Sequence, residues 1–293
     1  MKGHFVPWLY AIAAKIRQVS LREMALDASV MAAAVIDSGK LFNSPVLCMN
    51  FDPTLWGEAA GCSTNWEGAL PLIEPGGSPD PNPDAVRESV RVTTLVEAIG
   101  RVKGAMPQSK LVCAVAGPAT IARLLEFENP VSRMDQFTVG ELVTEFVTVL
   151  CENKIDNVIL VEDAQIDDHA LAPWVEGKQY SRIARLADHY SAETTLLCPR
   201  ASLDEDQTRE FDAFTYVVGQ PEKTIQAKLT NAAKGLLVSG FGTGSVSLPA
   251  GLETLEEGGY FLTTAEDLDA EADFSEIQLD IATVTAFLNQ PKS

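Results

Sequence analysis

The sequence predicts an α/β protein that folds as a single-domain (β/α)8, or TIM, barrel. Short apolar segments alternate along the chain with longer segments of helical pattern, which is the order of elements in this fold. Two of the apolar segments, Val158–Val161 and Leu236–Val238, are continuously apolar, as expected of parallel strands buried on both faces. The 293 residues suffice for one barrel over 1–293. An open, doubly wound sheet is the alternative, because a sequence does not show whether a sheet closes.

The predicted strands are short and rich in aliphatic residues. There are eight of them, at His4–Trp8, Pro45–Phe51, Lys110–Ala116, Asp156–Glu162, Glu193–Cys198, Phe214–Val218, Lys234–Ser239 and Gly259–Thr263. In a barrel the residues that follow these strands gather around one opening, which is where such proteins place their active sites.

Helical patterns fill the intervening segments. Ser20–Ser38 starts with a capping box, because Glu23 follows Ser20 by three positions, and Gly39 is suited to end it. The other predicted helices are Asp84–Met106, Ala119–Phe127, Val139–Cys151, Leu171–Tyr190, Pro221–Ala233, Leu252–Glu257 and Ser275–Leu288. Leu70–Asp84 is rich in Pro and Gly, which predicts a loop near the barrel opening.

Composition narrows the choice of partners and compartment. The formal net charge is −19, which disfavours nucleic acid and anionic membrane surfaces and leaves small molecules or other proteins, including a second copy of the chain. The five cysteines form no CxxC pair, as expected in a reducing compartment. No signal peptide or membrane-spanning run is visible. We therefore expect a cytoplasmic protein.

The catalytic candidates are carboxylates at predicted strand ends. Glu162 and Asp163 directly follow the apolar run Val158–Val161. Adjacent acids can point to opposite sides, and burial would raise the pKa of the inward one towards general acid–base duty. A solvated loop start or a helix cap is the alternative. Asp52 follows the second strand and is the third candidate, although Asp-Pro also fits a turn.

Further residues near the strand ends are candidates for contacting substrate. They are Trp8, Tyr10, Asn50, Glu58, His169, Arg200 and Gly240. Gly240 opens the glycine-rich turn Gly240–Ser245, and loops in this part of a barrel often bind phosphate through backbone N–H groups. Cys198 is the only candidate metal ligand, and a weak one, since a buried inert thiol is commoner.

Three segments resemble the uroporphyrinogen decarboxylase-like superfamily, which also contains corrinoid methyltransferases. The stretch from Leu41 to Cys62 is similar to its second-strand region, on the residues Leu41–Cys48, Phe51–Pro53 and Trp56–Cys62, and includes a Glu-Ala-x-Gly segment at Glu58–Gly61. Val115–Thr120 resembles its Gly-Pro-x-Thr turn after the third strand, and Ile155–Asp163 resembles its fourth strand. The resemblance implies a TIM barrel that acts on a small substrate, a corrinoid or another tetrapyrrole, in some members together with a corrinoid protein.

The chain departs from the family at the residues that carry its chemistry. Pro7–Ala11 replaces the Arg-rich segment that grips substrate carboxylates, and Phe42–Pro45 lacks the catalytic Asp of the decarboxylases. Leu196–Cys198 keeps only the Cys of the zinc-binding His-x-Cys pair, and Gly240-Phe241 stands where the later Cys belongs. Zinc is therefore disfavoured, because three protein ligands are normally needed.

Two functions remain open. The chain is either a divergent methyltransferase-like or decarboxylase-like enzyme, or a non-catalytic barrel that binds a ligand or partner and has lost the family's active site. The polar residues at the predicted strand ends favour the enzyme.

Overall fold

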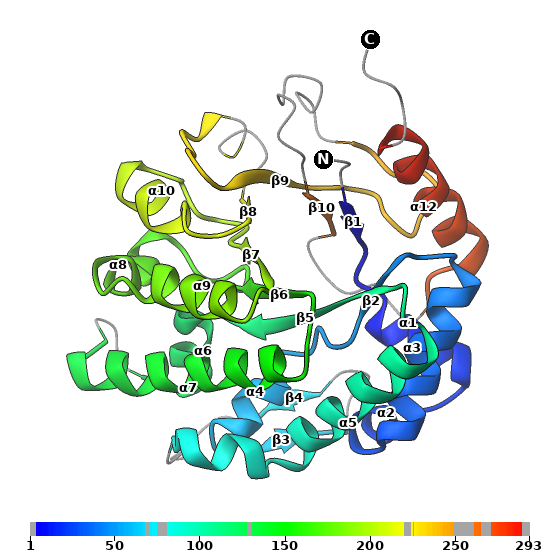
Figure 1. The fold of residues 1–293 in the computed structure, drawn as a ribbon, viewed down its shortest axis with the longest axis horizontal. Helices are drawn as coiled ribbons and strands as arrows, with labels where there is room; N and C mark the ends of the chain where they lie inside the picture. Colours follow the sequence, from blue (N-terminus) through cyan, green and yellow to red (C-terminus); the bar gives the residue numbers. More distant parts are fainter. Residues whose placement is uncertain are drawn as a thin grey trace.

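The computed structural model describes residues 4–67, 71–74, 81–127, 131–219, 224, 226–248, 261–264 and 271–288, and its centre is a barrel of eight parallel strands (Figure 1). The barrel strands are β1 (His4–Val6), β2 (Val46–Cys48), β5 (Lys110–Ala116), β6 (Asn157–Val161), β7 (Glu193–Leu197), β8 (Tyr216–Val218), β9 (Ala233–Leu237) and β10 (Phe261–Thr263). Their hydrogen-bonded order is β1-β10-β9-β8-β7-β6-β5-β2. The end strands β1 and β2 contact each other without being ladder partners, so the barrel is nearly closed.

The predicted (β/α)8 fold and its eight strands are confirmed. Each observed strand lies within its predicted segment, except that β9 begins one residue earlier, at Ala233. The first strand is shorter than predicted because the backbone of Trp8 has left the sheet and donates to Thr264 Oγ1 at 3.2 Å.

Helices surround the strands (Figure 1). They are α1 (Tyr10–Arg17), α2 (Leu21–Leu26), α3 (Ala28–Leu41), α4 (Thr54–Ala59), α5 (Val90–Ala105), α6 (Pro118–Leu124), α7 (Arg133–Glu152), α8 (Asp168–Glu176), α9 (Gln179–His189), α10 (Glu205–Phe211) and α12 (Phe274–Leu288), with the 3-10 helix η1 (Pro83–Glu88) before α5. No helix among the described residues is long and apolar enough to cross a bilayer.

Apolar side chains fill both the inside of the barrel and the layer between strands and helices. The inner cluster contains Val6, Trp8, Val46, Val112, Ala114, Ile159, Leu197, Tyr216, Val218 and Phe261. Strand residues in alternate register, such as Cys113 and Leu160, pack outward against the helices. Burial on both faces explains why these strands are continuously apolar in the sequence.

Two predicted helices are interrupted in the structure. The segment predicted as Ser20–Ser38 breaks at Asp27, whose backbone is extended and whose carboxylate accepts from the N–H groups of Ser29 and Val30 to start α3. The segment Leu171–Tyr190 breaks at Lys178, which has a left-handed φ of 54°. At Asp27 a side-chain cap outweighs the continuous helical pattern, whereas at Lys178 a left-handed residue without a side-chain cap separates α8 from α9.

The prediction of a helix over Pro221–Ala233 is wrong beyond Gln226. Residues 227–232 are not helical, because Asp212 Oδ1 accepts from the backbone N–H groups of Thr230, Asn231 and Ala232 at 2.7–3.0 Å. The predicted helix Leu252–Glu257 lies outside the described residues.

A small hairpin follows α4. Its strands β3 (Thr64–Asn65) and β4 (Leu72–Ile73) pair antiparallel. Part of the predicted loop Leu70–Asp84 is therefore a strand, and its end enters η1, while residues 75–80 lie outside the described part of the chain.

Candidate functional site

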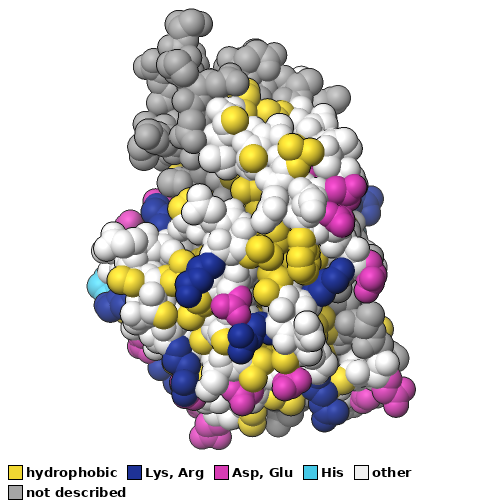
Figure 2. Space-filling model, turned by 90° about the vertical axis from the view of Figure 1, so that its right-hand side faces the viewer, with side chains coloured by type: hydrophobic (Ala, Val, Ile, Leu, Met, Phe, Trp, Pro, Cys, Tyr) yellow, Lys and Arg dark blue, Asp and Glu magenta, His cyan; other side chains and the backbone are white. Residues whose placement is uncertain are grey.

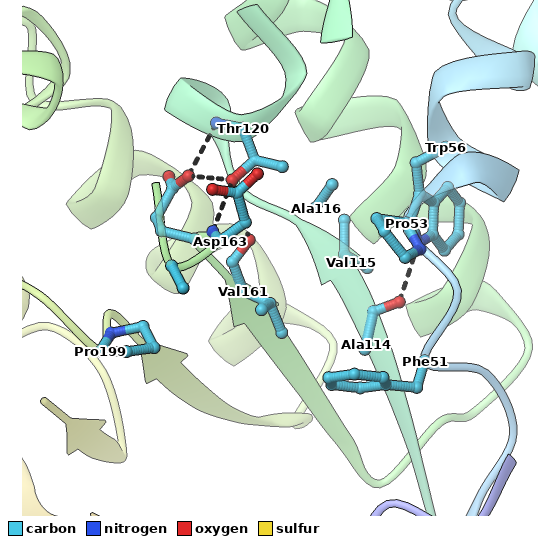
Figure 3. Close-up of a pocket in the computed structure, with 12 residues that line it drawn as sticks. Phe51, Pro53, Trp56, Ala114, Val115, Ala116, Thr120, Val161, Asp163 and Pro199 are labelled. Atoms are coloured by element: carbon cyan, nitrogen blue, oxygen red, sulfur yellow. Dashed lines mark hydrogen bonds between the residues drawn. The ribbon is translucent and has the colours of Figure 1, made fainter. Parts of the chain in front are cut away.

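A cavity of about 200 Å³ lies at the carboxyl ends of β5 and β6 (Figure 3). Most of the side chains that surround it are apolar, and Thr120, Glu162 and Asp163 are the polar ones. The full lining is Phe51, Pro53, Trp56, Ala114, Val115, Ala116, Thr120, Val161, Glu162, Asp163, Ala164 and Pro199. This is the end of the barrel at which (β/α)8 enzymes carry out their chemistry.

Glu162 directly follows β6 and is almost completely buried, at 1% exposure. Its Oε2 accepts from Thr120 N at 2.8 Å and from Thr120 Oγ1 at 2.6 Å. Its Oε1 accepts from Ala119 N at 3.2 Å and from Tyr180 Oη at 2.6 Å. The two backbone donors belong to the first turn of α6, where unpaired N–H groups favour an anion. Four donors therefore converge on one carboxylate.

These contacts have opposing effects on the titration of Glu162. Burial raises its pKa from 4.5 to about 7, and the hydrogen bonds from Thr120, Tyr180 and Ala119 act to lower it. The pKa of Tyr180 is raised well above its ordinary value by burial and then by the Glu162 charge, so it stays a phenol that donates. A buried carboxyl that titrates near neutrality in a cleft is typical of functional sites.

Gly117 makes room for this arrangement. A Cβ atom at this position would overlap the Glu162 carboxylate. Pro118 then occupies the first turn of α6, where its missing N–H costs nothing. The Gly-Pro-Ala-Thr segment thus delivers both the space and the donors that Glu162 needs.

Asp163 lies at the rim of the cavity. Its carboxylate forms an ion pair with Arg123 of α6, and its side chain is 26% exposed. Its backbone N–H donates to Thr120 Oγ1 at 2.9 Å. Of the two adjacent acids, Glu162 is buried and Asp163 remains partly exposed.

Asp52 belongs to a separate cluster and does not line the cavity. Its Oδ2 accepts from Arg91 Nη2 at 2.5 Å, and its Oδ1 accepts from the N and Oγ1 of Thr54. Arg91 is fully buried, lies 3.4 Å from Glu58 Oε2, and stacks on Trp66 at 4.8 Å. This cluster anchors the segment between β2 and α4, which supplies one wall of the cavity.

Two of the predicted substrate-binding residues support that wall from behind. Trp8 is buried, its Nε1 donates to Thr264 O at 2.9 Å, and its ring packs on Phe51 at 4.4 Å. Asn50 is also buried, and its Nδ2 donates to the backbone of the β2–α4 segment at 3.2 Å. Tyr10 was expected at the opening, but it lies in α1 and is buried in the outer core.

Three further candidates lie outside the cavity lining. His169 is on α8, beside a surface depression that Arg133 and Gln179 also line. Arg200 is exposed, and its Nη1 donates to Ala164 O at 3.3 Å, next to the rim. Glu58 points to the buried guanidinium described above.

The expectation that the Gly240 turn contacts substrate finds no support in its surroundings. The N–H groups of Gly242, Gly244 and Val246 donate to the carboxylate of Asp280 on α12, at 2.7, 3.2 and 3.0 Å. An internal carboxylate thus takes the donors that a phosphate would use, and the turn packs against α12 in the outer layer.

The described residues do not offer a zinc site. Cys198 is buried, and burial, followed by the charge of Glu162, raises the pKa of its thiol well above the usual value. No group of three or more His, Cys, Asp or Glu in the described part of the chain is placed to hold a metal ion.

Several site residues were not predicted from the sequence. Thr120 lies in the recognised Gly-Pro-x-Thr turn, so that motif could have nominated it. Tyr180, Arg91 and the wall residues Phe51 and Trp56 reach the site only through tertiary packing.

Comparison with known proteins returns structural matches only. No protein-family model and no curated protein match the chain. A methyltransferase from Methanosarcina mazei superimposes with a TM-score of 0.73 at 14% identity, over 98% of this chain and 92% of that one. A protein from Anabaena variabilis named as a sugar phosphate isomerase/epimerase gives 0.52 at 8% identity, over 98% of both chains. The chain therefore shares its (β/α)8 fold with enzymes of different activities.

Proposed function

We propose that the chain is a methyltransferase-like enzyme whose small substrate binds in the cavity at the ends of β5 and β6. The observation that supports this proposal is the cavity itself, whose mostly apolar walls meet the buried carboxyl of Glu162. The apolar walls suit a methyl-bearing group, and a space of about 200 Å³ suits a molecule of few heavy atoms.

The charges around the cavity favour methyl transfer over decarboxylation. Both charged residues that line it, Glu162 and Asp163, are acidic. An anionic carboxylate substrate would be repelled there, whereas a methyl donor need carry no negative charge. We assign Glu162 the role of the proton donor or acceptor, because its pKa of about 7 leaves both forms populated near neutrality.

A corrinoid enters this proposal as a methyl acceptor outside the cavity. In this proposal a corrinoid or its carrier protein approaches over the opening of the cavity, with the small substrate held below. Phe51 and Pro53, with the buried Trp56 behind them, would then hold the substrate on one side and exclude water.

The experiment is a methyl-transfer assay. The protein is incubated with methylated amines, thioethers and methoxy compounds together with reduced cobalamin, and both the corrinoid absorbance and the mass of the demethylated product are followed. We expect product with at least one donor class, and loss of turnover in Glu162→Gln but not in Glu176→Gln, which changes an exposed acid on α8. Full activity in Glu162→Gln would remove this residue from the mechanism.

A second function, binding without turnover, is favoured by the pairing of all three candidate carboxylates. Glu162 accepts four hydrogen bonds, Asp163 pairs with Arg123, and Asp52 pairs with Arg91. Binding of a small molecule in a calorimetric titration, together with no product in the methyl-transfer assay, would select this alternative.

A further inference from the structure

We propose that the cavity selects a small methylated ammonium cation over neutral molecules of the same shape. The inference deepens the proposed function, since it names the substrate class of the same cavity. It is carried by the juxtaposition of an aromatic wall with carboxylates in one cavity.

Aromatic rings form one side of the cavity. Figure 3 shows Phe51 and Trp56 on the side opposite Thr120 and Asp163. Phe51 is half-buried, and its ring is supported by Trp8 at a centroid distance of 4.4 Å. Trp56 is completely buried behind this wall, where its Nε1 donates to Ala114 O at 2.8 Å, so Phe51 supplies the ring that a ligand can reach. Rigid aromatic rings attract a cation through their negative faces.

The charges near the cavity add to this attraction. Glu162 and Asp163 line it, and no Lys, Arg or His belongs to the described lining. The neighbouring Arg123 is paired with Asp163 at the rim. Arg91, behind the wall, is paired with Asp52. Their positive charges are therefore already compensated, and the carboxylate of Glu162 is the one without an ionic partner among the contacts that surround it.

The hydrogen-bonding state of Glu162 favours methylated over unmethylated ammonium groups. Both of its oxygens already accept two hydrogen bonds each, from Thr120, Ala119 and Tyr180. An ammonium N–H that leaves water for this cavity would find few free acceptors, which costs binding free energy. A fully methylated nitrogen carries charge but has no N–H to satisfy.

The test compares isosteric ligands by isothermal titration calorimetry. Choline and tetramethylammonium are titrated into the full chain beside 3,3-dimethyl-1-butanol, the neutral carbon analogue of choline, and ammonium chloride, all at equal ionic strength. We expect choline to bind between about twofold and thirtyfold more tightly than the neutral analogue, which is the range of cation–π stabilisation. Ammonium should bind more weakly than tetramethylammonium.

Two variants locate the effect, and a third serves as control. Phe51→Leu keeps an apolar wall without a π face, and Asp163→Asn removes one of the two lining charges. Both should reduce the preference for choline. Phe137→Leu changes a ring that is 60% exposed on α7, away from this cavity, and should leave the preference intact.

The outcomes separate this inference from the proposed function. Equal or tighter binding of 3,3-dimethyl-1-butanol would overturn the cation preference while leaving a small-molecule cavity in place. An unchanged preference in both Phe51→Leu and Asp163→Asn would show that the cation binds elsewhere. Binding of none of the four ligands would overturn the ammonium class, and the methyl-transfer assay with thioethers and methoxy compounds would then decide the proposed function by itself.

Discussion

At the scale of single residues, the site depends on how one carboxylate is accommodated. Glu162 is carried by β6, its donors come from the start of α6 and from Tyr180 of α9, and Gly117 leaves the space it occupies. These parts belong to different elements, so a small change in any of them acts on Glu162. Two expectations follow, one steric and one electrostatic.

The steric expectation concerns Gly117→Ala. Its new Cβ would overlap the Glu162 carboxylate, so the substitution should lower the free energy of unfolding by about 1–3 kcal/mol, as overpacking does. The matched control is Gly100→Ala in α5, where a Cβ has nothing within 4 Å and a helical Ala is preferred over Gly. Urea unfolding of both variants is the measurement. Equal stability of the two would contradict the assigned role of Gly117.

The electrostatic expectation concerns pH. The folded-state pKa of Glu162 is about 7, against an ordinary value of 4.5, so the folded chain binds more protons than the unfolded chain at pH values between these two. Stability should therefore fall as pH rises from about 5 to 7, by at most about 3 kcal/mol from this group. Urea unfolding across this window should show a shallower slope in Glu162→Gln than in the parent chain. Parallel slopes would show that Glu162 has an ordinary pKa.

At the scale of elements, two segments without regular structure are held by single charged residues. The β2–α4 segment is fixed by Arg91, and the turn after β9 is fixed by Asp280, whose carboxylate takes three backbone N–H groups. Each side chain replaces the hydrogen bonds that a helix or strand would supply internally. The loss of either one would leave buried polar groups without partners.

For Arg91, the expected result is a large loss of stability. Arg91→Met leaves Asp52 without its buried partner, which should cost about 3–5 kcal/mol. Arg182→Met removes a partly exposed pair with Glu141 and should cost less than about 1 kcal/mol. Thermal and urea unfolding of both variants provide the comparison. A cost for Arg91→Met as small as that of the control would mean that the cluster does not hold the wall.

For Asp280, the expected result is local. Asp280→Asn keeps the shape of the side chain but replaces one acceptor oxygen by an NH2 donor, which faces backbone donors in the turn. Amide hydrogen exchange should rise in residues 240–248 more than in β6 or β7. Unaltered exchange in the turn, with the fold intact, would show that the turn does not depend on this carboxylate.

At the scale of the whole molecule, the net charge of −19 should set the response to salt. Figure 2 shows acidic and basic side chains interspersed on one face, where local pairs compensate each other. The excess of acids over the chain still repels itself, and salt screens that repulsion. The melting temperature at pH 8 should rise by a few degrees between low and moderate NaCl. A fall would show that the ion pairs outweigh the repulsion.

The same scale shows how far the sequence predicts this protein. All eight barrel strands were predicted from short apolar runs between helical patterns, and two of these runs are continuously apolar because parallel strands are buried on both faces. Helix interruptions at Asp27 and Lys178 were missed, since caps and left-handed residues act locally against a continuous pattern. Glu162 was placed at the opening by its position after a strand. The sequence could not place the partners Arg91 and Tyr180 at the site, because they reach it from other helices.

The border between β1 and β2 has a consequence for how the molecule opens. These strands contact each other, but no ladder joins them, whereas every other neighbouring pair of barrel strands is hydrogen-bonded. Among the described residues, the two strands meet at this seam without a ladder of backbone hydrogen bonds. Local opening of the barrel should therefore begin between β1 and β2. A proline or a proteolytic cleavage site introduced beside these two strands would be tolerated better than one between β5 and β6.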